Sequence, residues 1–261
     1  MNILHDKRLR RVYWKDLTRL SFKETFIENT LPLPWLAVSW LLAYYHYYII
    51  ALPFSFIFFL AGLRQVHNGF HYTLGTSAAA TWITLFVNSL LMLAAMHAVK
   101  YNHLRHHKYC LQEEDIEGNC AKMRPLKAIA YGPVFIFRMH RAALQSKNRL
   151  IVRNTCAELL AIAVFISLVL LLGIHFLVYH IIAMTVGEFL TGFFAVWTVH
   201  HDCDEHLFAR TLSNKWKNRL TYNMFFHLEH HLFPGVPTIK LPQLSERIKD
   251  ELPDIRPKQV F

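Results

Sequence analysis

Three clusters of closely spaced histidines constrain this chain more than any other feature of its sequence. They follow the patterns H-x3-H, H-x2-H-H and H-x2-H-H, and they comprise His67, His71, His103, His106, His107, His227, His230 and His231. Residues three and four positions apart share one face of a helix, so the imidazoles of each cluster point the same way. Neutral imidazole binds zinc, copper, iron and nickel. Because one ion takes at most about six ligands, eight histidines predict a site for two metal ions.

Long apolar runs separate the clusters and predict an all-α integral membrane protein. Hydrophobic residues make up 54% of the 261 positions, which is more than a soluble domain usually carries. The runs are residues 35–50, 54–66, 155–174 and 176–199. Turns are expected near Pro53 and at Gly173, within each pair of runs. We therefore predict four transmembrane helices in two hairpins, with the histidine clusters on a helical cap.

A fifth apolar run, residues 78–99, is long enough by hydropathy alone to cross a membrane. His71 precedes it and His103 follows it, and both are expected to bind the same pair of metals. A single crossing would put these two histidines on opposite sides of the bilayer. We therefore predict that the segment is re-entrant, interfacial or packed beneath the cap, because irregular backbone at that depth is tolerated only where protein covers it.

The distribution of basic residues predicts the orientation of the chain in the membrane. The sequence holds 28 Lys and Arg against 18 Asp and Glu, and the turns near Pro53 and Gly173 contain none of the basic residues. By the positive-inside rule, both termini and all the histidine clusters are expected to be cytosolic. Because the basic residues flank apolar runs, the net charge of +10 favours a membrane surface over nucleic acid.

We expect a single domain covering residues 1–261. Its parts are an N-terminal segment that is amphipathic or solvated (1–30), a first hairpin (31–66), the first two clusters with the interfacial run (67–153), a second hairpin (154–199) and the cap (200–261). No apolar stretch typical of a cleaved signal peptide opens the sequence. The four cysteines form no C-x-x-C pair, which disfavours a zinc ribbon and favours reduced thiols.

Residues next to the clusters are candidates for the same site. The last apolar run ends at His200 and His201, and we expect one of them to complete the ligand set, with His201 preferred. Asp202, Asp204 and Glu229 adjoin histidines and are candidates for orienting imidazole N–H groups. Solvated surface charge is an equally good explanation for these three carboxylates.

Glu188 lies inside the last apolar run, where a carboxylate is costly and often functional. A hydrogen bond within the helix bundle is the alternative explanation. Several histidines stand alone and are expected to be solvated or structural: His5, His46, His140, His175 and His180.

The three histidine patterns, in their order and spacing, resemble the membrane fatty acid desaturase and hydroxylase superfamily. The stretch HHLFPGVP, residues 230–237, is similar to the third histidine box of acyl desaturases in particular. The resemblance covers nearly the whole chain, since the boxes and both hairpins agree. The sequence departs from many front-end desaturases by having His227 where they have glutamine, and it lacks the H-P-G-G of a fused cytochrome b5 domain.

The resemblance implies a di-iron enzyme of lipid metabolism that uses O2 to introduce a double bond into a fatty acyl chain. The implied iron ligands are the eight clustered histidines and His201. Electrons would come from a separate protein of the ferredoxin or cytochrome b5 type. No catalytic residue beyond the metal ligands is implied.

Other functions share part of this pattern. A hydroxylase or ketolase acting on a fatty acid or carotenoid would use the same metal site, and only the mass of the product distinguishes it from a desaturase. A metal transporter would place ligands at the membrane midplane rather than at helix ends. A zinc metalloprotease is disfavoured, because the chain has no H-E-x-x-H motif.

Overall fold

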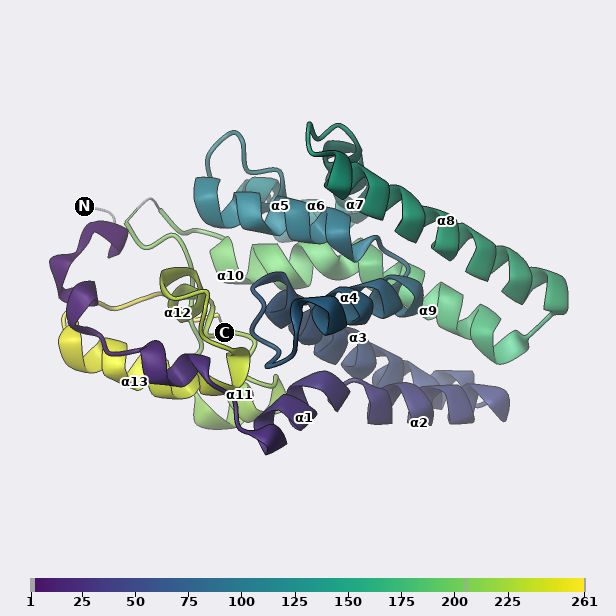
Figure 1. The fold of residues 1–261 in the computed structure, drawn as a ribbon, viewed down its shortest axis with the longest axis horizontal. Coiled ribbons are helices and arrows are strands. Elements are labelled where there is room, and N and C mark those ends of the chain that lie inside the picture. Colours follow the sequence, from purple (N-terminus) through teal and green to yellow (C-terminus); the bar gives the residue numbers. More distant parts are fainter. Residues whose placement is uncertain (1–2, 205, 261) are drawn as a thin grey trace.

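The computed structural model describes residues 3–204 and 206–260, and this part of the chain is almost entirely helical (Figure 1). The α-helices are α1 (Phe22–Thr30), α2 (Leu33–Tyr44), α3 (Tyr48–Phe70), α4 (Ala78–Met92), α5 (Met96–Tyr109), α6 (Pro125–Ala130), α7 (Gly132–Leu144), α8 (Arg149–Leu172), α9 (His175–Thr191), α10 (Thr198–His200), α11 (Lys215–Leu220), α12 (His227–Leu232) and α13 (Leu241–Glu251). Among the described residues, β structure is limited to one isolated bridge between Thr211 and Gln259. The predicted all-α class is confirmed.

Three helical stretches are long and apolar enough to cross a membrane, as expected of a membrane protein. They are Tyr48–Phe70, Arg149–Leu172 and His175–His200. The pair α4 and α5 would make a fourth only if it formed one broken span. Helix α2 has twelve residues and extends about 18 Å, which is less than the hydrocarbon core of about 30 Å. The four crossings predicted from the sequence therefore remain a prediction.

The second hairpin turns where the sequence predicts, whereas the first hairpin turns earlier than predicted. The second turns at Gly173, whose φ of +62° is the left-handed conformation that glycine adopts readily. In the first, Pro53 lies inside α3, and the chain turns earlier, at residues 45–47, with His46 at a φ of +62°. The expected turn at Pro53 was wrong. Because Pro53 lies in the second turn of α3, its missing N–H removes one hydrogen bond near the helix start and leaves the rest of the helix intact.

The apolar run at residues 78–99 turns back on itself. It forms α4 and the start of α5, whose axes are bent by 109° at a short break. The Nε2 atoms of His71 and His103, on either side of the run, lie 3.0 Å apart. Gly62 of α3 allows the end of α4 to pack closely against α3, because a Cβ at this position would lie 2.8 Å from the sulfur of Met92. The two ends of the run therefore lie close together, as the geometric argument requires, and its re-entrant placement remains a prediction.

Glu158 of α8 supplies the hydrogen bonds that the broken backbone between α4 and α5 lacks. Its carboxylate accepts from the His97 backbone N–H at 3.0 Å and contacts the His97 ring Nδ1 at 2.6 Å. It also accepts from the Ser89 hydroxyl, which itself accepts from the Met96 N–H. Glu158 is fully buried. An apolar setting requires such internal partners, because water does not reach these groups.

Two of the isolated histidines complete this support for the break. His140 Nε2 accepts from the Ala95 N–H at 2.9 Å, and His180 Nε2 donates to the Leu91 carbonyl at 2.8 Å. Each of these two histidines therefore has a structural role, because its ring forms a hydrogen bond with a backbone group at the bend.

We expect Glu158→Ala to destabilise the protein strongly. The substitution leaves the His97 backbone N–H and ring and the Ser89 hydroxyl without their buried partner, at a cost of about 3 kcal/mol or more. For a chain of this size that corresponds to a fall in melting temperature of roughly 5–10 °C. The measurement is thermal unfolding of the purified protein in detergent. The matched control is Glu246→Ala, which removes an exposed carboxylate; equal melting temperatures for the two variants would contradict the role of Glu158.

The N-terminal segment packs on the cap at the end of the molecule that carries α12 and α13 (Figure 1). Residues 3–18 form three short 3₁₀ turns, and their apolar side chains share a core with α13. Arg247 of α13 pairs with Asp16. The segment is therefore part of the cap and forms no continuous amphipathic helix.

Candidate metal centre

The histidine clusters meet at one place. It is enclosed by the C-terminal end of α3, the C-terminal half of α5, and the helices α10 and α12. Their ring nitrogens form two neighbouring groups. The first group is His67, His71, His103, His107 and His230, and the second is His106, His200, His227 and His231. The rings of His107 and His231 stack at 4.2 Å between centroids, which places the two groups side by side. All eight clustered histidines are brought together.

Short distances between Nε2 atoms define both groups. In the first group, His103 lies 3.0 Å from His71 and 3.1 Å from His107, and His107 lies 3.0 Å from His230.

In the second group, His200 lies 2.9 Å from His106 and 2.8 Å from His227, and His227 lies 3.1 Å from His231. A metal–nitrogen bond of about 2.0–2.1 Å separates two ligands at right angles by about 2.9 Å. The observed spacings therefore match neighbouring ligands of one ion in each group.

Hydrogen bonds on the outer ring nitrogens determine which nitrogen faces the centre. His106 Nδ1 lies 2.7 Å from Asp115, and His200 Nδ1 lies 2.7 Å from the Phe208 carbonyl oxygen. Both partners accept, so we infer that Nδ1 carries a proton in each ring. The two Nε2 atoms face one another 2.9 Å apart.

Burial favours the metal-binding form of the imidazoles in the cap. It is the largest cause that holds the pKa values of His227, His230 and His231 well below the usual range, and neighbouring imidazoles add to it. Burial likewise lowers the pKa of His71 to about 2. These rings are neutral at pH 7, as a metal ligand must be. Within the described part of the chain, His67 Nε2 is buried and has no hydrogen-bond partner, as expected for a nitrogen that binds a metal.

The structure places His200, and not the preferred His201, among the clustered histidines. The His201 ring stacks on Trp197 at 3.9 Å, and its Nδ1 bonds the carbonyl of that residue. His200 instead points into the second group. Residues Gly192–Trp197 form a π-helix, which turns every later residue about the helix axis relative to an uninterrupted α-helix. Sequence periodicity has no means of detecting such an insertion.

Asp115 and Glu117, to which the sequence assigned no role, form hydrogen bonds with imidazoles of the second histidine cluster. Asp115 accepts from His106 at 2.7 Å, and Glu117 accepts from His103 Nδ1 at 3.0 Å. Both lie in the loop after α5 and are buried. The signal in the sequence is a short acidic stretch, Glu113, Glu114, Asp115 and Glu117, that follows the second histidine cluster.

The local environment sets the protonation of these two carboxylates differently. Burial raises the pKa of Asp115, but the hydrogen bond and charge of His106 outweigh it and lower the pKa to about 2. Burial is the largest effect on Glu117 and raises its pKa to about 7. Asp115 is thus a fixed anion beside one ring, whereas Glu117 lies close to its titration point.

Three carboxylates adjoin histidines in the sequence and were candidates for orienting imidazoles. All three have their hydrogen-bond partners outside the two histidine groups. Glu229 accepts from Thr211 and Ser245, at 2.7 Å each, and so ties α12 to α13. Asp202 lies 3.5 Å from Arg210. Asp204 accepts backbone N–H groups of residues 206 and 207. Glu229 is buried and structural, and the two aspartates contact no imidazole of the two groups.

The thiol of Cys110 lies beside the second group, one helical turn after His106. Burial raises the pKa of this thiol, and the nearby carboxylates Asp115 and Glu117 raise it further. The thiol is therefore protonated in the absence of an ion, and Cys110 is a further candidate donor beside the imidazoles of this group.

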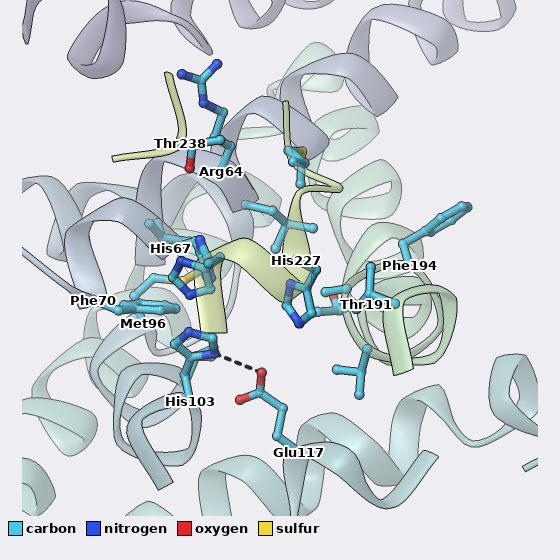
Figure 2. A pocket seen from close by; sticks show the side chains of 18 of the residues that line it. Arg64, His67, Phe70, Met96, His103, Glu117, Thr191, Phe194, His227 and Thr238 are labelled. Atoms are coloured by element: carbon cyan, nitrogen blue, oxygen red, sulfur yellow. Dashed lines mark hydrogen bonds and ion pairs between the residues drawn. The ribbon is translucent and has the colours of Figure 1, made fainter. Parts of the chain in front are cut away.

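A cavity lined mainly by apolar side chains opens against the first group and His227. Figure 2 shows His67, His103 and His227 turned toward one another across it, with Glu117 bonded to His103 and Phe70 and Met96 on the same wall. The Arg64 guanidinium points away from these rings and pairs with Glu28 of α1. Imidazole nitrogens that can bind a metal therefore line one wall of the apolar cavity.

Comparison with known proteins agrees with this arrangement. A family model described as Fatty acid desaturase matches residues 50–260. That range contains all nine histidines of the two groups, both carboxylates that bond them and the cavity. No individual curated protein matches the chain. The chain belongs to the fatty acid desaturase family, whose members are oxidoreductases.

Proposed function

We propose that this protein is a membrane di-iron enzyme that uses O2 to introduce a double bond into a fatty acyl chain. The observation that carries the proposal is the pair of imidazole groups, with nine histidines in all, at the wall of an apolar cavity. Four to five nitrogen donors per group suit one transition-metal ion each and leave room for an exogenous ligand. Family membership favours iron among the metals that imidazole binds.

The proposed ligands divide into two sets. His67, His71, His103, His107 and His230 would hold one ion, and His106, His200, His227 and His231 the other. When bound, the irons supply the redox capacity to activate O2 for removal of hydrogen from an unactivated carbon chain. Asp115 and Glu117 hold the rings of His106 and His103 in the orientation and tautomer that binding requires.

The cavity would hold the hydrocarbon chain next to the centre. Its walls include Phe135, Met139, Phe194 and Val199, which exclude water and favour an alkyl chain. Exclusion of water protects a reactive oxidant from side reactions. The position of the chain against the metals would determine which carbon pair reacts.

We also propose that both termini, the metal centre and the cap face the cytosol, supported by the basic residues that flank the apolar helices. Four crossings in two hairpins, with α4 and α5 re-entrant between them, would satisfy this orientation. Electrons would come from a separate protein of the ferredoxin or cytochrome b5 type.

The test is expression in a lipid-producing host, followed by mass spectrometry of total lipids. We expect products two hydrogens lighter than their parent chains, and about two iron atoms per purified chain from the ligand count. His106→Ala, which removes a ligand of the second group, is the inactive control. A gain of one oxygen instead would assign the same site to a hydroxylase, and a carbonyl product would assign it to a ketolase. One iron in active protein would contradict the two-metal proposal.

A further inference from the structure

Four polar atoms that line the cavity, or the centre beside it, are buried without a hydrogen-bond partner among the described residues. They are Arg64 Nε, His67 Nε2, Glu117 Oε2 and Glu188 Oε1. His67 and Glu117 belong to the metal centre, and Arg64 forms an ion pair with Glu28 near the cap. Glu188 belongs to neither place, so its free oxygen needs another explanation.

Glu188 is set in the middle of an apolar helix and is only 5% exposed. Its other carboxylate oxygen, Oε2, accepts from the Thr191 hydroxyl at 3.4 Å, which is at the far limit of a hydrogen bond. The same hydroxyl is shared with the Gly187 carbonyl. Removing a carboxyl group from water without full hydrogen bonding is costly. The side chain therefore stands in the cavity wall with acceptor capacity that the protein itself does not use.

Glu188 lines the cavity at a distance from the metal centre along its helix. It precedes His200 by twelve positions on the continuous helical stretch His175–His200, so the two residues are separated by about 18 Å along the axis at the rise of an α-helix. Phe194 and Ile136 also line the cavity. A chain whose reacting carbons lie at the metals could thus extend toward Glu188.

We propose that Glu188 recognises a hydrogen-bond donor, a hydroxyl or an amino group, carried on the hydrocarbon chain of the substrate. The substrate class would then be polar-substituted acyl chains rather than plain ones, and this inference rests on the proposed acyl-chain function. A methyl-terminated chain leaves the carboxyl group unsatisfied, whereas a donor-bearing chain satisfies it in an environment where that bond is strong. Discrimination of this kind exceeds what an apolar pocket achieves.

The test compares matched ligands without turnover. Saturated fatty acids of ten to eighteen carbons, and their counterparts with a terminal hydroxyl or a terminal amine, compete with a fluorescent fatty acid for metal-loaded protein in lipid nanodiscs. We expect at least one hydroxy or amino chain to bind about 10- to 100-fold more tightly than the unsubstituted chain of equal length. Equal binding, or tighter binding of the methyl-terminated chain at every length, would overturn the proposal.

Variants assign the preference to Glu188. Glu188→Leu should abolish it. Glu188→Gln keeps the shape and an acceptor but has no charge, so it should retain a preference for hydroxyl and lose one for ammonium. Thr185→Val on the same helix, whose hydroxyl bonds the Ile181 carbonyl and which does not line this cavity, is the matched control and should preserve it.

A preference that survives Glu188→Leu would contradict the inference. If that variant fails to retain iron, the glutamine variant and the wild-type comparison decide. Absence of binding by every probe would count against the acyl-chain function itself. The product mass measured in the lipid-producing host is independent of these results, so the two proposals fail separately.

Discussion

His200→Ala is expected to lower turnover by more than about a hundredfold, since loss of even an outer-shell partner of a metal ligand costs about 10- to 100-fold. His200 lies within 3 Å of His106 and His227 through Nε2, and no neighbouring group replaces it in that position. Iron content should fall from about two atoms toward one per chain, because the second group would retain only three imidazoles. The measurements are product formation and metal analysis of the same preparation. Alanine at each of the eight clustered histidines should give the same type of loss.

His201→Ala is the matched control, since it removes the same side chain one position later. The ring it removes stacks on Trp197 and belongs to neither histidine group, so activity should stay within about twofold of wild type. The pair tests directly which of the two histidines belongs to the second group. Loss of iron in the His201 variant together with retained iron in the His200 variant would reverse the assignment.

Asp115→Asn is expected to cost about 10- to 100-fold in metal affinity or activity, the usual effect of removing the partner that orients a metal-bound imidazole. Asp115 also accepts the backbone N–H groups of Leu111 and Gly118, so it shapes the loop that carries it. Asparagine keeps the size of the side chain but presents an amide that can turn its N–H₂ toward His106. Glu117→Gln should act in the same way through His103. Metal titration of the stripped protein measures the affinity separately from turnover.

Glu113→Gln and Glu114→Gln are the controls for these substitutions, because both residues lie in the same acidic stretch and are exposed. Both variants should bind metal like the wild type. An equal effect of all four substitutions would mean that the net charge of the loop, rather than the two hydrogen bonds, determines metal binding.

The sequence alone determined which histidines gather at the site and the class of the fold. Histidine spacings of three and four positions encode a shared helix face through local backbone geometry. The eight clustered histidines were therefore found without knowledge of any contact between them. The constraint that His71 and His103 must meet also predicted that residues 78–99 return to the side from which they start. That inference needed only the requirement that ligands of one ion be close together.

The tertiary structure decided what depends on contacts between distant segments or on irregular backbone. Asp115 and Glu117 were distinguished from their exposed neighbours only by the fold of the loop. The structural role of Glu229 in α12 became visible only through its bonds to Thr211 and Ser245, which are remote in sequence. Only the packed structure showed that His200 faces the centre while His201 stacks on Trp197, after a π-helix that periodicity does not encode. The free oxygen of Glu188 became visible only when the surrounding helices were placed. Hydrogen-bond satisfaction is a property of the packed structure, whereas shared helix faces are a property of the local chain.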